Sequence, residues 1–315
     1  MKIFITGWQG FIGSHLRKRL SEHELILLQN DLRDDKEVAH EILDADPEII
    51  VHLAARTEVE QSFYEQITFS EVNYTGTVNL IETAKRLKNL KNFVFASTME
   101  VYGWQPISDL IKAGTNKGII AFNEQTPPNP NAPYAVAKYA CEKYLEYAHR
   151  SYGLPFTAIR QTNAFGRKDN DFFVTEQIIT QMIKNKDEIN LGYGTPYRNF
   201  IYIDDLLDAW EEVIRNPEKV VGEIFCLGPD NAIRIEDYVT IIANKLGWNG
   251  KVNWNTKPER PGEIWLLNST NHKITSKLGW APKVSMNEGL DRTIDHWKSK
   301  IGTKWKDGTT EVKSL

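Results

Sequence analysis

A tyrosine and a lysine four positions apart are the first residues of this chain that suggest chemistry. In Tyr134-Ala-Val-Ala-Lys138 the phenol and the ammonium occupy positions i and i+4, which share one face of a helix. A tyrosine with an ordinary pKa of about 10 is a poor base at neutral pH. A lysine cation beside it stabilises the phenolate and makes it able to accept a proton. The pair therefore predicts a general base.

A second pair of the same kind, Tyr139 and Lys143, follows five positions later. On a helix it would face about 140° away from the first pair, so the two pairs cannot face one cleft. We favour Tyr134, because it follows a proline-rich loop and begins its helix at the carboxyl edge of the predicted sheet, where α/β proteins place their sites. A chance occurrence is the alternative for either pair in a chain with 12 tyrosines.

Three glycines near the N-terminus form a turn that suits a dinucleotide. They stand between an apolar strand and a helix, where the first permits a tight turn, the second lets backbone amides approach a pyrophosphate, and the third allows helix and strand to pack closely. The helix N-terminus adds positive potential. A glycine-rich turn without a ligand is the alternative. The predicted cofactor-binding residues here are Gly7, Trp8, Gln9, Gly10, Phe11, Ile12 and Gly13.

The residue that would decide between NAD and NADP is missing from its usual place. A carboxylate at the end of the second strand favours the free ribose 2′-hydroxyl of NAD, and an arginine favours the 2′-phosphate of NADP. Here the strand ends in Gln29 and Asn30, the nearest acid is Asp31, and Arg33 lies within reach along the sequence. The sequence leaves both cofactors open.

Alternating strands and helices must position these residues. We predict buried strands at 2–6, 25–28, 49–53, 93–96 and 156–160, with helices at 11–21, 38–43, about 67–88 and 133 to about 152. Such alternation implies right-handed crossovers and an α/β fold, a doubly wound parallel Rossmann sheet. Residues 103–131 hold prolines and glycines without periodicity and are predicted to form a long loop.

Beyond about residue 165 the predicted elements become shorter, which suggests a second lobe. We expect a dinucleotide-binding domain over 1–165 and a smaller mixed α/β substrate lobe over 166–315, with a segment at about 195–227 packing back on the first domain.

Composition narrows the function classes. The apolar share of 41% and the charged share of 25% are those of a globular protein. A net charge of −4 without a dense basic run argues against a nucleic-acid surface. Cys141 and Cys226 form no CxxC motif and the histidines show no ligand spacing, so no metal site is expected. The sequence shows neither a secretory leader nor a run of about 18 apolar residues, and we expect a cytoplasmic protein that contacts no membrane.

Several further motifs make the chain recognisable. It resembles the extended short-chain dehydrogenase/reductase family, in its nucleotide-sugar epimerase/dehydratase branch, over nearly its whole length. The segments that carry the resemblance are TGWQGFIG at 6–13, DLRD at 31–34, HLAA at 52–55, VNYTGT at 72–77, STMEVYG at 97–103, YAVAK at 134–138, RNFIYIDD at 198–205 and RPGE at 260–263.

The resemblance implies a role for each matching residue. Thr98 hydrogen-bonds the sugar O4, Tyr134 removes or returns the O4 proton, and Lys138 holds the nicotinamide ribose. The cofactor would be NAD or NADP, tightly bound and recycled in each turnover, and the substrate a nucleotide sugar. The remaining implied contacts are Asp31 and Leu32 at the adenine ring, Leu53, Ala54 and Ala55 along the cofactor, Asn163 at a substrate phosphate, and Arg198 and Arg260 as a diphosphate clamp.

The resemblance leaves the reaction open after the common first step, the oxidation of sugar C4 to a ketone. Return of the hydride after rotation of the sugar gives 4-epimerisation. Elimination of water across C5–C6 needs a base, and Glu100 stands where the family's dehydratases carry a glutamate. Met99 replaces the aspartate of the dTDP-glucose-type dehydratases, whereas GDP-mannose-type enzymes lack that aspartate and related decarboxylases share the T-x-E pattern.

Other readings stay open at this point. Glu100 could simply bond local backbone at a strand end. A reductase that releases its oxidised cofactor, and a non-catalytic NAD(P)-sensing protein that binds partners, are the alternatives to an epimerase or dehydratase.

Two further expectations concern the surface. Tyr134 follows Thr98 by 36 positions, more than the family pattern suggests, and the extra length falls at 105–118. We hypothesise that this insertion forms a flap over the substrate, a neutral surface insertion being the alternative. The resemblance also implies a homodimer through helices near 67–88 and 132–150, with Tyr139, Tyr144 and Tyr147 in the contact or in the core.

Overall fold

The computed structural model describes residues 1–114, 119–302, 304–306 and 309–311. Its centre is a sheet of six parallel strands in the order β10-β5-β4-β3-β1-β2. These strands are β1 (Lys2–Thr6), β2 (Glu24–Leu27), β3 (Ile49–His52), β4 (Asn92–Thr98), β5 (Phe156–Gln161) and β10 (Glu223–Leu227). The predicted α/β fold with a doubly wound parallel sheet is therefore confirmed.

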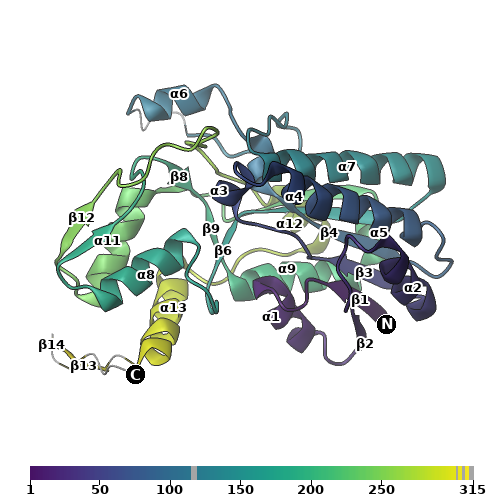
Figure 1. Cartoon of the computed structure of the whole chain (residues 1–315), viewed down its shortest axis with the longest axis horizontal. Coiled ribbons are helices and arrows are strands. Elements are labelled where there is room, and N and C mark those ends of the chain that lie inside the picture. The colour runs from purple at the N-terminus through teal and green to yellow at the C-terminus, as the bar shows by residue number, and fades with distance from the viewer. Residues whose placement is uncertain (115–118, 303, 307–308, 312–315) are drawn as a thin grey trace.

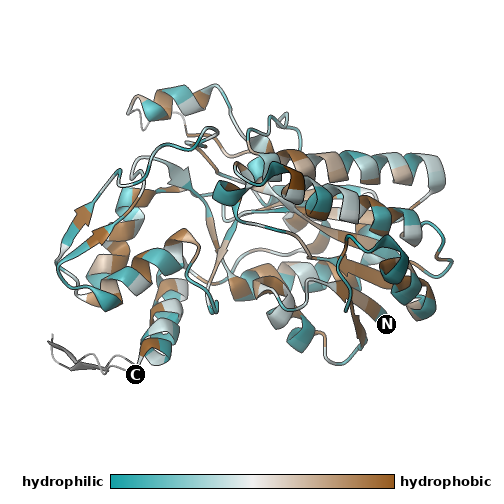
Figure 2. Cartoon of the chain, viewed as in Figure 1, coloured by the Kyte–Doolittle hydropathy of each residue, from teal (hydrophilic) through white to brown (hydrophobic). Residues whose placement is uncertain are grey.

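Helices cover both faces of this sheet (Figure 1). On one face lie α1 (Phe11–Arg19) and α9 (Ile203–Arg215), and on the other α2 (Asp35–Ala45), α5 (Gly76–Ala84) and α7 (Pro133–Tyr152). Successive strand residues point to opposite faces. Ile3, Ile5 and Val94 accordingly pack with α1 and α9, while Phe4 and Phe93 pack with the other three helices. Figure 2 shows the resulting apolar strands as brown ribbons.

Two sequence expectations need refinement. The helical stretch predicted at about 67–88 is present and runs over 66–84, but it consists of α4 (Gln66–Ser70), a π-helical turn η1 (Glu71–Thr75) and then α5. The wider turn lets the buried Asn73 reach the backbone of Arg56, which a continuous α-helix pattern cannot foretell. The predicted loop at 103–131 contains a helix, α6 (Ile107–Lys112), whose Ile111 is buried against the core.

The C-terminal half forms a second lobe beside the sheet and also returns to it. The lobe holds three long helices, α8 (Val174–Lys184), α11 (Ile235–Leu246) and α13 (Met286–Ile301). Small two-stranded sheets accompany them, formed by β6 (Asn163–Phe165) with β9 (Phe200–Tyr202), β7 (Glu188–Asn190) with β12 (Lys251–Asn253), β8 (Tyr197–Arg198) with β11 (Ile233–Arg234), and β13 (Lys304–Lys306) with β14 (Thr309–Glu311). The chain crosses back between β9 and β10, so that α9 and β10 complete the central sheet layer.

The remaining elements are short. They are α3 (Val59–Ser62), the 3₁₀ turn η2 (Met99–Tyr102), α10 (Pro217–Val220) and α12 (His272–Leu278). Within the described residues, no helix combines the length and hydropathy that a membrane span requires. The same part of the chain holds no group of three His, Cys, Asp or Glu side chains placed to bind a metal ion.

Candidate active site

The glycine turn joins β1 to α1 and leaves its outer side open. Gly7 has φ +66°, and a Cβ there would lie 2.5 Å from the Ala54 nitrogen. A Cβ on Gly13 would lie 2.2 Å from the Gly7 oxygen, so both positions require glycine. Gly10 differs, because its Cβ would meet only the Gly7 oxygen, at 3.3 Å.

This open side has the chemistry of an anion site. Gly10 is the N-cap of α1, no side chain caps the helix, and its first turn contains no acidic residue. The first amides of α1 thus have no partner within the helix and carry its positive dipole end. A bare glycine at the cap and unpartnered amides fit the pyrophosphate of a dinucleotide, and the structure therefore suits the predicted cofactor.

Other predicted residues of the turn fix its surroundings. The Trp8 indole donates to the Leu28 oxygen at 2.9 Å, and the guanidinium of Arg17 lies 4.9 Å from the Trp8 ring centre. Phe11 has the ammonium of Lys168 4.9 Å from its ring centre, and Ile12 packs against the core, whereas Gln9 is exposed. Side chains of the turn therefore contact the end of β2 on one side and Lys168 of the second lobe on the other.

A carboxylate stands at the end of β2 after all, supplied by α2. Glu41 accepts hydrogen bonds from the backbone nitrogens of Gln29 at 3.1 Å and Asn30 at 3.2 Å. Arg33 donates to Asp31 from Nε at 2.9 Å and from Nη2 at 2.7 Å, and this pairing lowers the pKa of Asp31 to about 2. The predicted adenine contact Leu32 is buried, and a Cβ on Gly76 would lie 2.8 Å from the Leu32 Cβ.

A chain of buried hydroxyls supports the end of β3. His52 hydrogen-bonds Thr6 at 2.7 Å and Thr77 at 2.8 Å, and Thr6 in turn accepts from the Ala54 nitrogen at 3.1 Å. Because Thr77 already donates to the Asn73 oxygen, the His52 Nε2 must be the protonated nitrogen. Burial also holds the pKa of His52 well below its usual value. The half-buried segment Leu53–Ala55 is thus fixed beside the glycine turn.

The ends of β4 and the start of α7 bring the predicted catalytic residues together. Thr98 is 7% exposed, Tyr134 8% and Lys138 3%. Burial raises the pKa of Tyr134, and a hydrogen bond with Thr98 opposes that rise. The Lys138 ammonium donates to the Ala96 oxygen at 2.8 Å, and burial lowers its pKa to about 8. The phenol of Tyr134 and the hydroxyl of Thr98 are thus in hydrogen-bond contact, and the Lys138 ammonium is buried against the end of β4.

The second tyrosine–lysine pair lies elsewhere on α7. Lys143 is half exposed and binds Glu146 at 2.9 Å, with its ammonium 5.2 Å from the ring centre of Tyr139. Tyr139 packs against the cluster that contains Met99 and Tyr102.

Glu100 faces the predicted diphosphate clamp. Its backbone nitrogen donates to the Thr98 hydroxyl at 3.1 Å, as in a local turn. Burial raises the pKa of the Glu100 carboxyl, and the charges of Arg198 and Arg260 oppose that rise. Its negative charge raises the pKa of Tyr134. The carboxyl is therefore buried where its charge acts on the phenol and where the charges of both arginines act on it.

The two arginines converge on a residue that the sequence had offered only as part of a motif. Arg198 donates to Glu263 at 2.9 Å, and Arg260 donates to both oxygens of the same carboxylate at 2.7 and 2.8 Å. Asn163 begins β6 and is paired with Phe200 of β9, which lies two positions after Arg198 in sequence. Two guanidinium groups on one anion form a site that suits a diphosphate.

Part of the predicted flap docks beside this clamp. Lys112 at the end of α6 binds Glu259 at 2.6 Å, and its ammonium lies 5.3 Å from the ring centre of Trp265. Glu259 immediately precedes Arg260. Residues 115–118, the rest of the predicted flap, lie outside the described residues.

Sequence reasoning missed residues that hold the site from behind. They are Thr6, His52, Asn73 and Thr77 beneath the cofactor turn, Glu41 at the end of β2, and Glu142 and Arg160 beneath the catalytic centre. Arg160 carried a signal in the sequence, because a charge inside an otherwise buried strand requires a partner.

Comparisons with known proteins show the family of this chain. Residues 3–228 match the model of the NAD dependent epimerase/dehydratase family. The dTDP-D-glucose 4,6-dehydratase of Dictyostelium discoideum is 33% identical over 272 residues, which are 77% of this chain and 62% of that protein. A putative UDP-glucose 4-epimerase of Methanocaldococcus jannaschii is 27% identical over 325 residues, 96% of this chain and all of the relative.

Solved structures give the same picture. The UDP-glucose 4-epimerase of Thermotoga maritima with UDP-glucose superposes with a TM-score of 0.84 at 26% identity, covering 95% of this chain and 99% of the other. This chain spans less than two thirds of the Dictyostelium dehydratase but nearly the full length of the two epimerases. Because the family model matches well over half of the chain, the protein belongs to the NAD-dependent epimerase/dehydratase family.

Proposed function

We propose that this chain oxidises C4 of a nucleotide-linked hexose and then eliminates water across C5–C6, as a nucleotide-sugar 4,6-dehydratase. The observation that carries the proposal is the buried Glu100 carboxyl, whose backbone nitrogen donates to the Thr98 hydroxyl and whose charge acts on Tyr134. Burial raises the pKa of this carboxyl, which makes the carboxylate a stronger base than an exposed glutamate. Simple 4-epimerisation needs no such group.

The substrate class rests on Arg198 and Arg260. In the structure both guanidinium groups are bound to Glu263. A diphosphate offers more oxygen acceptors and more negative charge than one carboxylate, so a nucleotide sugar can share or take over these donors.

The first step uses Thr98, Tyr134 and Lys138. Bound at the glycine turn, NAD(P)⁺ supplies the acceptor for the C4 hydride and a positive ring charge beside the phenol. Thr98 hydrogen-bonds the sugar O4 and orients it, Tyr134 removes the O4 proton, and the C4–H bond breaks as the ketone forms. Lys138 supplies the cation that stabilises the Tyr134 phenolate.

The second step uses Glu100. The new ketone acidifies the C5 proton, which moves to the Glu100 carboxylate. The C6–O bond then breaks, and the hydroxyl leaves as water with the proton that Glu100 took up. A bound NAD(P) would supply the hydride for C6. A proton from solvent adds to C5, Tyr134 releases the O4 proton that it took up in the first step, and the product is a 4-keto-6-deoxy sugar.

The second candidate is 4-epimerisation, and Met99 favours it. This side chain is apolar and 1% exposed, packed with Val101 and Tyr102. It therefore offers no acid for the departing C6 hydroxyl, so that Glu100 would have to serve alone.

Incubation with UDP-, dTDP-, GDP- and CDP-hexoses in D₂O, followed by NMR, tests the proposal. Dehydration gives a 4-keto-6-deoxy product with deuterium at C5, and epimerisation gives a C4-inverted sugar without it. Glu100→Gln should abolish elimination while C4 oxidation continues, and Glu146→Gln, the same change on the solvent side of α7, should leave both steps intact. A C4-inverted product whose rate is unchanged in Glu100→Gln establishes the epimerase instead. Tight NAD(P) binding without turnover of any hexose in the panel would refute both enzymes.

We also propose that NAD is preferred over NADP. Arg33 is the arginine nearest in sequence to the end of β2, and it is held by both oxygens of Asp31. Glu41 adds a carboxylate against the backbone of Gln29 and Asn30. A ribose 2′-phosphate would bring further negative charge to this place, whereas a 2′-hydroxyl can donate to a carboxylate.

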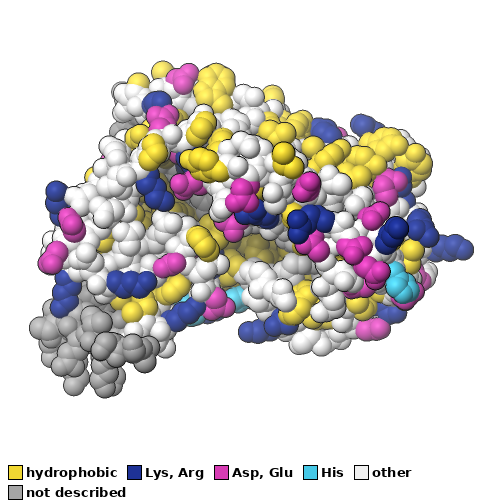
Figure 3. All heavy atoms as spheres, viewed as in Figure 1, with side chains coloured by type: hydrophobic (Ala, Val, Ile, Leu, Met, Phe, Trp, Pro, Cys, Tyr) yellow, Lys and Arg dark blue, Asp and Glu magenta, His cyan; other side chains and the backbone are white. Residues whose placement is uncertain are grey.

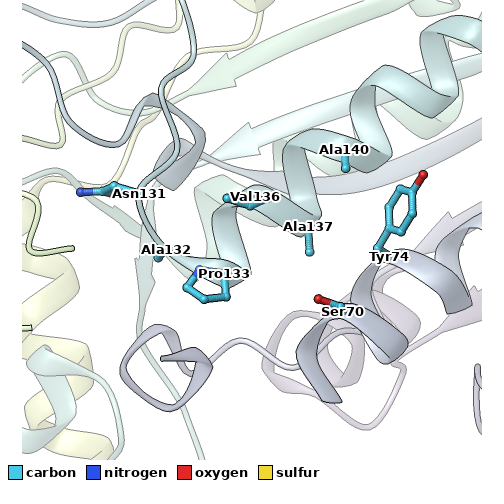
Figure 4. A pocket seen from close by; sticks show the side chains of 8 residues that line it. All are labelled: Ser70, Tyr74, Asn131, Ala132, Pro133, Val136, Ala137 and Ala140. Atoms are coloured by element: carbon cyan, nitrogen blue, oxygen red, sulfur yellow. The ribbon is translucent and has the colours of Figure 1, made fainter. Parts of the chain in front are cut away.

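We propose finally that two copies associate through α5 and α7. A groove of about 470 Å³ runs between η1 and the start of α7, lined largely by apolar side chains (Figure 4). Along α7, Val136 is 51% exposed and Tyr147 40%, and Figure 3 shows hydrophobic side chains gathered over this part of the surface. A second α7 packed antiparallel against the first would cover both residues, since helix pairs bury such stripes.

Light scattering of the purified protein tests this association. Val136→Glu should give a monomer, while the control Leu110→Glu on α6, at an equally exposed apolar residue, should not. A monomeric wild-type protein would refute the proposal.

A further inference from the structure

A buried ion pair lies directly beneath the catalytic centre. Glu142 of α7 has no exposed surface, and the side chain of Arg160 of β5 is 4% exposed. The guanidinium donates to the carboxylate from Nη2 at 2.7 Å and from Nε at 3.0 and 3.2 Å. The fork-to-fork geometry satisfies both charges inside the core.

This pair joins the two segments that carry the predicted catalytic residues. On one side, the Ser97 hydroxyl hydrogen-bonds Glu142, and Ser97 immediately precedes Thr98. On the other side, Arg160 donates at 2.8 Å to the hydroxyl of Tyr102, two residues after Glu100. The Tyr102 hydroxyl in turn donates a hydrogen bond to the Asn123 oxygen at 2.6 Å.

The position of Glu142 on its helix completes the connection. It lies one helical turn after Lys138 and about two turns after Tyr134, on the buried side of α7. One carboxylate thus touches the strand end before Thr98 and lies on the helix face that presents Tyr134 and Lys138.

A gain in folding stability is a weak explanation for a buried ion pair. Removing two charges from water costs several kcal/mol per ion, and well-packed apolar side chains of similar volume often do as well or better. We propose that Glu142 and Arg160 are positioning residues that hold the Thr98–Glu100 segment against α7, and that the Glu142 carboxylate supplies the negative charge facing the Lys138 ammonium. The positioning half of this proposal rests on the proposed function; the charge half does not.

The surroundings of Lys138 show what this charge must oppose. Burial lowers the pKa of Lys138 to about 8, while Cys141 and Glu142 on the same helix raise it. From β3 the fully buried His52 stays neutral, its own pKa held low by burial and by the Lys138 charge. From β4 the Ala96 oxygen accepts from the ammonium, and the centre of the Phe95 ring lies 4.7 Å from it.

Two variants separate the charge effect from the structural one. Glu142→Gln leaves Arg160 as an unpaired cation in the core, so Lys138 loses a favourable charge and faces a like one. Its titration midpoint should fall by about one pH unit or more. The double change Glu142→Gln with Arg160→Met removes both charges, and the midpoint should stay within about half a unit of the wild type.

The charge half is measured on the NAD-loaded protein by ¹⁵N NMR titration of lysine side chains, with the Lys138 resonance assigned by its loss in Lys138→Met. Glu146→Gln is the matched control, because it removes the same charge from the same helix at the solvent-side pair with Lys143. It should leave the midpoint unchanged. A folded Glu142→Gln protein with the wild-type midpoint overturns the charge half.

The positioning half is measured by turnover of a nucleotide sugar that the wild type accepts. The double variant should lose at least about tenfold in kcat with KM changed by less than about threefold, since its binding groups remain while Thr98 and Glu100 are less well held. A kcat within twofold of the wild type overturns this half, and the double variant decides it even if Glu142→Gln does not fold. A wild type that turns over no nucleotide sugar refutes the proposed function and leaves the lysine titration as the deciding measurement.

Discussion

Replacing Gly10 by alanine should weaken cofactor binding and leave the fold intact. The backbone of Gly10 has φ −68° and ψ 174°, which any residue adopts, and its Cβ would meet only the Gly7 oxygen, at 3.3 Å. Alanine is a poorer N-cap than glycine, by up to about 1 kcal/mol, while a less flexible unfolded chain returns about 0.4–1 kcal/mol. The free energy of unfolding of the apoprotein should therefore change by less than about 1 kcal/mol.

The same methyl group should weaken binding of the cofactor. The methyl group would point to the open side of the turn, where the backbone must approach the pyrophosphate closely. We expect the Kd for NAD⁺ to rise at least tenfold, which is about 1.4 kcal/mol. Gly13→Ala is the matched control, because its Cβ would lie 2.2 Å from the Gly7 oxygen and 2.7 Å from the Trp8 Cα. It should destabilise the apoprotein by more than about 2 kcal/mol, as overpacking of backbone does.

Urea unfolding of both apoproteins and calorimetric titration with NAD⁺ measure the two effects. If Gly10→Ala binds NAD⁺ with wild-type affinity, the pyrophosphate does not lie on this turn. If Gly13→Ala is as stable as the wild type, the steric reasoning about the turn is wrong.

Three further predictions follow from the site. Asp31→Asn should free Arg33 and narrow the preference for NAD⁺ over NADP⁺ at least about tenfold, as titration of the apoprotein with both cofactors would show; an unchanged ratio contradicts the assigned pairing. Because the pKa of Lys138 is lowered to about 8, its cation is present below that pH and lost above it. Turnover should therefore fall about tenfold per pH unit above pH 8, and a flat pH profile up to pH 10 would show that turnover does not need the cation. Arg260→Met should raise KM for a nucleotide sugar at least about tenfold with an unchanged Kd for NAD⁺, and loss of NAD⁺ binding instead would place this arginine at the wrong ligand.

The sequence was sufficient for the sheet because local and global preferences agree there. Strands β1 and β3 contain the apolar runs Ile3-Phe4-Ile5 and Ile49-Ile50-Val51, which are typical of a parallel sheet covered on both faces. The π-helical turn at Glu71–Thr75 was not predicted, because it accompanies a tertiary hydrogen bond between Asn73 and Arg56. Helix α6 was not predicted for a similar reason, since its six residues depend on packing of Ile111 and cannot be stable alone.

The site divides in the same way. Motif spacing predicted Tyr134 and Lys138, and the family resemblance implied Thr98; in the structure all three side chains are buried, and Thr98 hydrogen-bonds Tyr134. It could not predict Glu41 at the end of β2, because that carboxylate arrives from a helix by a path that no strand pattern encodes. Glu263 stood in a quoted motif, but its place between two arginines depends on how two distant loops meet.

The pairing of β10 with β5 has a consequence for synthesis of the chain. Strand β5 ends at Gln161, and its outer edge stays unpaired until residues 223–227 have been made. At about 5–20 residues per second the ribosome takes roughly 3–12 s to make that intervening segment. During this time a nascent chain exposes an apolar strand edge of the kind that recruits other strands. Factors that bind nascent chains would therefore matter most for this protein between the synthesis of these two strands.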